Sequence, residues 1–168
     1  MLFSIFDLST VFLNCFFFSI QSLRPSTALV IVDVQNDFID GTLSLSNCPA
    51  KHNAAEVVPV INRLIDTVPF DAIVYTLDWH PADHCSFIEN VNIRKLNHSS
   101  PVKSDIKVYD TVIFDEYPDI EQKLWPAHCI QNSPGSQLHP DLKIVDESTD
   151  HMKRHVVYTK KGCKPDID

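Results

Sequence analysis

Apolar positions along this chain fall into two patterns, continuous runs and helical spacing. Residues 28–32 (Ala-Leu-Val-Ile-Val) form an unbroken apolar run, which is typical of a parallel strand buried on both faces. Residues 71–77 and 156–159 predict two further strands. Between the first two strands, a helix is predicted from a candidate cap at Asn53 to Pro69, with apolar positions at Val57, Val58, Ile61, Leu64, Ile65 and Val68. Strand, helix and strand in this order predict an α/β fold with a parallel sheet.

The segment between residues 86 and 124 gives weaker signals. Residues 108–114 alternate enough to predict a short strand, and residues 118–124 predict a single helical turn. Further on, residues 135–142 are predicted to form a loop with one more turn. No repeat or low-complexity stretch divides the chain, so we expect one domain.

Charge and cysteine content narrow the class of protein. The 168 residues include 14 Lys and Arg against 22 Asp and Glu, giving a net charge of −8. An acidic chain lacks the positive charge that binds a phosphate backbone, so we exclude nucleic acid as a partner. Five scattered cysteines without a CxxC pair favour a reduced, intracellular protein. We therefore expect a cytoplasmic location, with the nucleus as the alternative, and leave a homo-oligomer open.

Residues 1–23 are intensely apolar, interrupted at Asp7 and Asn14. A secretory signal has a positively charged start and a small-residue cleavage site, and neither is evident here. A membrane span needs about 20 apolar residues, which these interruptions weaken. Secretion or membrane anchoring is therefore less favoured than a non-native leader. We divide the chain into an apolar leader of unassigned status (1–26) and one domain (27–168).

Three predicted strands end in residues with metal-binding or catalytic chemistry. Asp33 follows the first strand, Asp78 and His80 follow the second, and Lys161 follows the third. Each of these residues alone is more simply a cap, turn or surface residue. Because ligands of open α/β sheets bind outside the carboxyl ends of the strands, together they predict one crevice.

The spacing of these residues indicates two kinds of chemistry. Asp78 and His80 lie two positions apart, so in extended backbone both side chains face one side. With His128 they form a His, His, Asp set whose open positions suit a catalytic metal. Lys161 beside Asp33 would stabilise the carboxylate, and such a pair can take a proton from a thiol and so activate a cysteine nucleophile.

Four motifs in order carry a resemblance to a known family. They are residues 32–38 (Val-Asp-Val-Gln-Asn-Asp-Phe), 78–81 (Asp-Trp-His-Pro), 125–129 (Trp-Pro-Ala-His-Cys) and 161–162 (Lys-Gly). With these motifs the chain resembles the nicotinamidases (pyrazinamidases) of the isochorismatase-like cysteine hydrolase superfamily. The second and third motifs narrow the resemblance from the superfamily to the nicotinamidases. The resemblance implies an isochorismatase-like doubly wound parallel sheet with flanking helices.

The resemblance also implies a reaction and roles for single residues. The reaction is hydrolysis of nicotinamide to nicotinate and ammonia through a cysteine thioester, a step of NAD salvage in pyridine nucleotide biosynthesis. Asp33 matches the catalytic acid that deprotonates the nucleophile, and Lys161 matches the catalytic lysine. Phe38 and Trp125 match the aromatic residues that flank the nicotinamide ring.

A divalent metal completes the expected site. Asp78, His80 and His128 match the family's metal ligands, and His84 matches a position that is an additional ligand in some members. Zinc suits this nitrogen and oxygen set best, with iron or manganese as alternatives.

One part of the family pattern has no counterpart in the sequence. The nucleophilic cysteine of the family lies beyond the lysine and a further strand, and neither Cys129 nor Cys163 matches it. The chain has three glycines, where an average usage of roughly 7% would give about a dozen. We therefore expect a fold that is incomplete at the C-terminus and a chain that is itself inactive. Two alternatives stay open: an inactive, truncated metal-binding isoform, and another isochorismatase-like amidase.

Overall fold

The computed structural model describes residues 26–115 and 119–166. The leader expected at residues 1–26 therefore lies, except for its last residue, outside the described residues. Within the described ranges, no helix combines the length and apolar character needed to cross a membrane.

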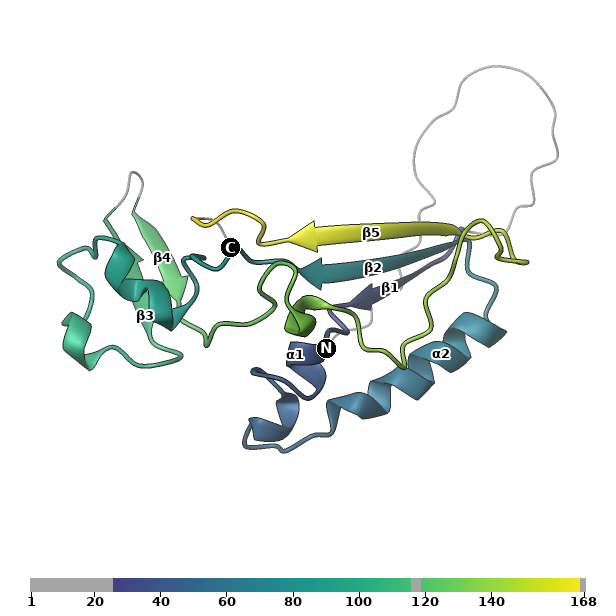
Figure 1. Ribbon diagram of the computed structural model, residues 1–168, viewed down its shortest axis with the longest axis horizontal. Coiled ribbons are helices and arrows are strands. Elements are labelled where there is room, and N and C mark those ends of the chain that lie inside the picture. The colour runs from purple at the N-terminus through teal and green to yellow at the C-terminus, as the bar shows by residue number, and fades with distance from the viewer. Residues whose placement is uncertain (1–25, 116–118, 167–168) are drawn as a thin grey trace, which may run out of the picture.

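A three-stranded parallel sheet forms the body of the fold (Figure 1). Its strands are β1 (Ala28–Val32), β2 (Ala72–Asp78) and β5 (His155–Lys161), with β2 in the centre. Val32 is paired with Thr76, and Asp78 with Lys161, so the carboxyl ends of all three strands lie at one edge. The α/β fold with a parallel sheet is confirmed, and β5 is longer than the strand predicted at residues 156–159.

Helix α2 (Val57–Thr67) covers one face of this sheet (Figure 1). The Asn53 side chain accepts a hydrogen bond from the backbone N–H of Ala55 and so caps the short 3₁₀ turn that leads into α2, as predicted. The apolar face of the helix, including Ile61 and Ile65, packs on Ile31 and Ile73 of the sheet in one buried core. Burying this core removes apolar surface from water and holds the strand ends in place.

The segment beyond the sheet contains an antiparallel hairpin of β3 (Thr111–Phe114) and β4 (Ile120–Lys123) with its own small core. The helical turn predicted for residues 118–124 is wrong, because residues 120–123 are a strand; Pro118 lies outside the described residues. Val112 and Gln122 are buried across from each other, so cross-strand pairing outweighs the local helical preference. The strand predicted at residues 108–114 begins later, at Thr111.

The remaining elements are short. Helix α1 (Asn36–Ile39) follows β1, and short 3₁₀ helices span Leu45–Asn47, Ala54–Glu56, Ile88–Ile93, Lys103–Asp105 and Pro134–Ser136. The last of these is the turn predicted within residues 135–142, shifted by one residue at its start. The hairpin lies beyond the carboxyl edge of the sheet (Figure 1), so that edge is flanked by α1 and the hairpin segment.

Candidate functional site

Lys161 joins the ends of all three strands. Its Nζ lies 2.9 Å from Oδ2 of Asp33 and also pairs with Oδ1 of Asp78. Burial alone would lower the pKa of Lys161, but the hydrogen bonds with Asp78 and Asp33 raise it above its ordinary value. Lys161 is therefore a fixed positive charge between two carboxylates, as the strand-end pattern predicts.

Asp33 is held in an uncommon backbone conformation. Its φ of 52° lies in the left-handed region, which is rare outside glycine but tolerated by Asp and Asn. The hydroxyl of Thr76 donates a hydrogen bond of 2.6 Å to Oδ1 of Asp33, while Oδ2 faces Lys161. A left-handed residue directly after a buried strand turns the chain sharply, and such conformations concentrate at functional sites.

The two oxygens of Asp78 face different groups. Oδ1 contacts Lys161, whereas Oδ2 lies 3.7 Å from Nε2 of His80 and 3.8 Å from Nε2 of His128. Burial would raise the pKa of Asp78, but the neighbouring His80 and the hydrogen bond with Lys161 outweigh it and lower the pKa to about 2. Asp78 therefore stays a carboxylate, with one oxygen directed at the two imidazoles.

Backbone carbonyls fix the orientation of both imidazoles. Nδ1 of His80 lies 3.1 Å from the carbonyl oxygen of Gly162, and Nδ1 of His128 lies 2.8 Å from that of Pro126. A carbonyl oxygen can only accept, so each Nδ1 carries the proton and donates it. Nε2 of each ring is thereby directed at Asp78, and burial lowers the pKa of His128. Asp78, His80 and His128 form a buried group whose ligand atoms all lie within 4.8 Å of one another.

His84 is buried next to this group without being part of it. Its ring centroid lies 4.2 Å from that of His80, and its Nδ1 faces the hydroxyl of Ser86 at 2.8 Å. Phe87, fully buried, contacts His80, His84 and His128 with ring centroids 5.4 to 5.6 Å apart. No sequence pattern indicated a role for Phe87, because this residue falls in the segment with weak patterns.

Gln35 and Asp37, both inside the first motif, form hydrogen bonds with the backbone at or next to the metal-ligand residues. The buried side chain of Gln35 accepts from the backbone N–H of Asp78 at 2.9 Å and donates to the Asp78 carbonyl at 2.7 Å. Asp37 accepts from the backbone N–H of Cys129 at 2.7 Å, next to His128. Sequence reasoning assigned neither a role, although polar residues directly after a buried strand were a usable signal.

Phe38 and Trp125, which were expected to flank the nicotinamide ring, both line a cavity of about 180 Å³. We call it the metal-facing cavity, because Asp78, His80 and His128 also line it. Its other lining residues are Leu43, Asp78, His80, Ser86, His128 and Lys161. Asp33 lines a neighbouring cavity that shares Phe38. The sequence-predicted residues thus line one space, except for two: Asp33 contacts it through Lys161, and His84 lies behind His80.

None of the described cysteines lines this cavity of about 180 Å³. Cys129 is buried, its thiol donates to the carbonyl of Gly135 at 3.9 Å, and burial raises its pKa. Cys163 is exposed, and Cys85 is buried in the core of the hairpin segment. A buried thiol with a raised pKa is a poor nucleophile, because the thiolate is the reactive form.

Comparison with protein families gives a match to the isochorismatase domain over residues 27–158. This chain belongs to the isochorismatase family. It is 40% identical over 124 residues to the nicotinamidase of Schizosaccharomyces pombe, a match that covers 73% of this chain and 49% of that relative. The chain spans about half the length of the curated relatives it matches.

Two solved structures resemble this isochorismatase-family chain. One is a nicotinamidase/pyrazinamidase of Acinetobacter baumanii, with a TM-score of 0.59 and 33% identity over 84% of this chain and 54% of that one. The other is the yeast nicotinamidase bound to the inhibitor nicotinaldehyde, with a TM-score of 0.58 and 31% identity over 82% and 57%. The family and the fold implied by the four motifs are thereby confirmed.

The isochorismatase-family site fits a divalent metal by its chemistry. One carboxylate oxygen and two imidazole nitrogens face one another, and these are the ligand types that zinc takes in catalytic sites. The same two-histidine, one-carboxylate set also binds iron. The Nδ1 hydrogen bonds to backbone carbonyls provide the outer contacts that usually orient metal-ligating histidines. Asp78, His80 and His128 can therefore hold a metal ion.

The lowered pKa of Asp78 predicts a pH-dependent stability for the metal-free chain. Its carboxylate stabilises the fold above its ordinary pKa of 3.8, and this contribution is lost as the pH falls through about 2. At neutral pH it amounts to about 2 kcal/mol. In urea denaturation with chelator, Asp78→Asn should lower the unfolding free energy at pH 7, and its difference from wild type should shrink below pH 4. Exposed Asp141→Asn is the control; a gap for Asp78→Asn that stays constant with pH would contradict the assignment.

Proposed function

We propose that this site is the metal- and ring-binding part of a nicotinamidase, which hydrolyses nicotinamide to nicotinate and ammonia in NAD salvage. The proposal is carried by one observation: the Asp78, His80 and His128 group, Lys161, and the aromatic pair Phe38 and Trp125 all line a single cavity. The similarity to nicotinamidases at 30–40% identity supports the choice of substrate.

The cavity binds a flat aromatic ring between apolar walls. Phe38 and Trp125 lie on elements far apart in sequence, at α1 and after β4, and both supply aromatic surface to the same space. Asp78, His80 and His128 would hold zinc at the base of this cavity. The ion held by these three residues would act as a Lewis acid towards the pyridine nitrogen or a water beside it.

Asp33, paired with Lys161, acts as the general base of the reaction. Oδ2 of Asp33 lies 2.9 Å from Nζ of Lys161, and this ion pair fixes the position of the carboxylate. In the reaction, the carboxylate takes the proton of a cysteine thiol, the sulfur bonds to the amide carbon, and the C–N bond breaks as ammonia leaves with that proton. Water then hydrolyses the thioester and releases nicotinate.

Neither Cys129 nor Cys163 supplies this nucleophile. The thiol of Cys129 is buried and directed at the Gly135 carbonyl, and Cys163 follows Lys161 at an exposed position. The second candidate function follows from this observation. The 168-residue chain would bind metal and nicotinamide as an isoform without turnover.

Calorimetric titration of the zinc-loaded chain with nicotinamide tests the proposal. We expect binding that disappears after zinc is removed with a chelator and weakens about tenfold in Phe38→Ala, because an aromatic wall is lost. The matched control is Phe70→Ala, which removes the same side chain from the core under the sheet, provided its thermal transition shows that it folds. In parallel, we expect no ammonia release.

Two results would count against this assignment. Equal nicotinamide binding with and without zinc would overturn the metal-dependent ring site. Ammonia release at enzymatic rates would keep the nicotinamidase function and overturn the isoform without turnover.

A further inference from the structure

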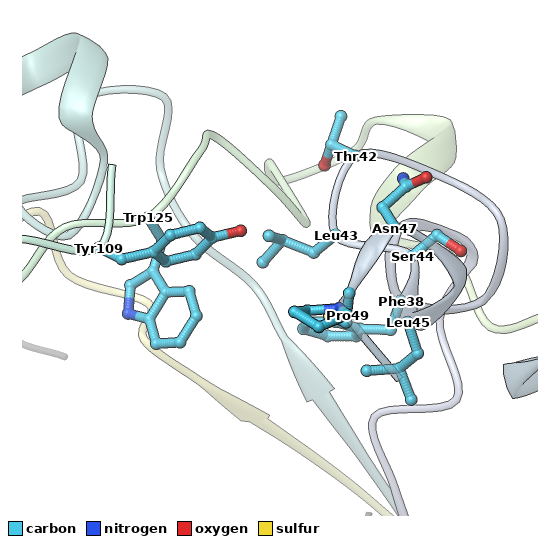
Figure 2. A pocket seen from close by; sticks show the side chains of 10 residues that line it. Phe38, Thr42, Leu43, Ser44, Leu45, Asn47, Pro49, Tyr109 and Trp125 are labelled. Atoms are coloured by element: carbon cyan, nitrogen blue, oxygen red, sulfur yellow. The ribbon is translucent and has the colours of Figure 1, made fainter. Parts of the chain in front are cut away.

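A second cavity of about 400 Å³ lies beside the metal-facing one. It is lined by Phe38, Thr42, Leu43, Ser44, Leu45, Asn47, Cys48, Pro49, Tyr109 and Trp125. Figure 2 shows Tyr109 and Trp125 on one side, Phe38, Pro49 and Leu45 on the other, and Leu43 between the two groups. We refer to this space as the side cavity.

The side cavity adjoins the proposed ring site. Phe38, Leu43 and Trp125 line both spaces, so the two cavities share part of their walls. Small-molecule sites usually measure about 300–1,000 Å³. The metal-facing cavity of about 180 Å³ is smaller than this range, whereas the two cavities together fall within it.

Hydrogen bonds hold the loop that forms the far wall. The backbone N–H of Leu43 donates to the Asp37 carbonyl at 2.9 Å, and that of Thr42 donates to the Asp37 carboxylate at 3.2 Å. The buried hydroxyl of Ser44 donates to the Ile39 carbonyl at 2.8 Å. The side cavity is therefore a preformed feature of the loop after α1, anchored to the first motif.

The lining determines which groups fit. None of the ten residues carries a charge, and three of them are aromatic. Tyr109 packs edge-on against Trp125, with ring centroids 5.5 Å apart, which extends the aromatic wall away from the metal-facing cavity. A phosphate or carboxylate placed here would lose its hydration without a basic partner, whereas an apolar ring would gain contact area.

We infer that the side cavity is a subsite for an uncharged aromatic or aliphatic group carried on the pyridine ring of the ligand. This inference rests on the proposed function, because the ring site is the anchor from which such a group extends. The ligand class thereby widens from nicotinamide to neutral, ring-substituted pyridine carboxamides. Phosphorylated nicotinamide derivatives are excluded from it.

Binding of matched ligands to the zinc-loaded, full chain tests the inference. The ligands are nicotinamide, nicotinamide with a phenyl group on ring carbon 5 or 6, and the same compounds with a carboxylate on the phenyl group. We expect at least one phenyl compound to bind about tenfold more tightly than nicotinamide, and its carboxylate form to lose this gain. Tyr109→Ala should remove the gain and change nicotinamide binding much less, because Tyr109 lines the side cavity and not the metal-facing one, which it adjoins through the edge of Trp125.

Cysteine alkylation locates the added group. Cys48 is exposed in the side cavity, whereas Cys163 is exposed elsewhere and serves as an internal control. The phenyl compound should slow alkylation of Cys48 by iodoacetamide and leave the rate at Cys163 unchanged, as measured by peptide mass spectrometry.

The outcomes separate the two proposals. If nicotinamide itself fails to bind, the proposed function fails, and the subsite falls with it. If nicotinamide binds but no phenyl compound binds more tightly, the subsite alone is overturned. A tighter phenyl compound that neither protects Cys48 nor responds to Tyr109→Ala also overturns it, because the group then binds elsewhere.

Discussion

His80→Ala is expected to abolish stoichiometric zinc binding. His80 supplies one of three ligand atoms, and its removal leaves Asp78 and His128 as a two-ligand site. Loss of an outer contact alone typically costs 10–100-fold in metal affinity, so loss of a ligand should cost at least about 100-fold. Elemental analysis after dialysis against trace zinc measures the bound metal per chain, and competition with a chromophoric chelator gives the affinity.

His98→Ala is the matched control, since His98 is exposed. It should retain one zinc per chain. Because His80 is buried, the variant also needs a fold check by circular dichroism and thermal unfolding in chelator, where both proteins lack metal. A folded His80→Ala chain that still carries one zinc ion would refute the ligand assignment.

Gly162→Ala is expected to weaken zinc binding although Gly162 offers no ligand atom. Gly162 has a φ of +62°, which costs an alanine about 1–2 kcal/mol. A Cβ at this position would overlap the imidazole of His80, whose Nδ1 also donates to the Gly162 carbonyl. The ring must therefore move, and we expect a loss of roughly 10–100-fold in zinc affinity, in the range of outer-contact substitutions.

The same chelator competition measures this loss. Cys163→Ala, at the next position along the chain and exposed, should bind zinc as wild type does. A double variant with His80→Ala separates the causes: if Gly162 acts through His80, adding Gly162→Ala should weaken zinc binding no further. Unchanged affinity in the single variant would show that the loop yields and that Gly162 does not position His80.

The sequence predicted the parts of the fold that depend on continuous apolar runs. The three parallel strands are confirmed, and so is helix α2, which follows the 3₁₀ turn capped by Asn53. The run at residues 28–32 is buried on one face and half-buried on the other, where burial on both faces was predicted. Their carboxyl ends brought Asp33, Asp78 and Lys161 together as expected, since strands that run parallel in one sheet must end at one edge.

Features that depend on contacts between distant segments could not be predicted from patterns in the local sequence. Residues 120–123 form a strand because Gln122 is buried opposite Val112, a pairing that local preference does not encode. Phe87 lies among three histidines for the same reason. The side cavity likewise depends on Tyr109 reaching the loop after α1, which no spacing in the sequence indicates.

The topology of the site also determines when it can form during folding. Strand β5 pairs with β2 across the 76 residues between Asp78 and His155, a stretch that contains His128. Contacts between such distant parts of a chain form late and slowly, because closing the long loop costs conformational entropy before the contacts contribute any stabilisation. The Lys161 bridge to Asp33 and Asp78 therefore exists only once the sheet is complete. The carbonyl of Gly162, directly after β5, orients Nδ1 of His80, so the metal-binding orientation of His80 would also form only after this long-range step.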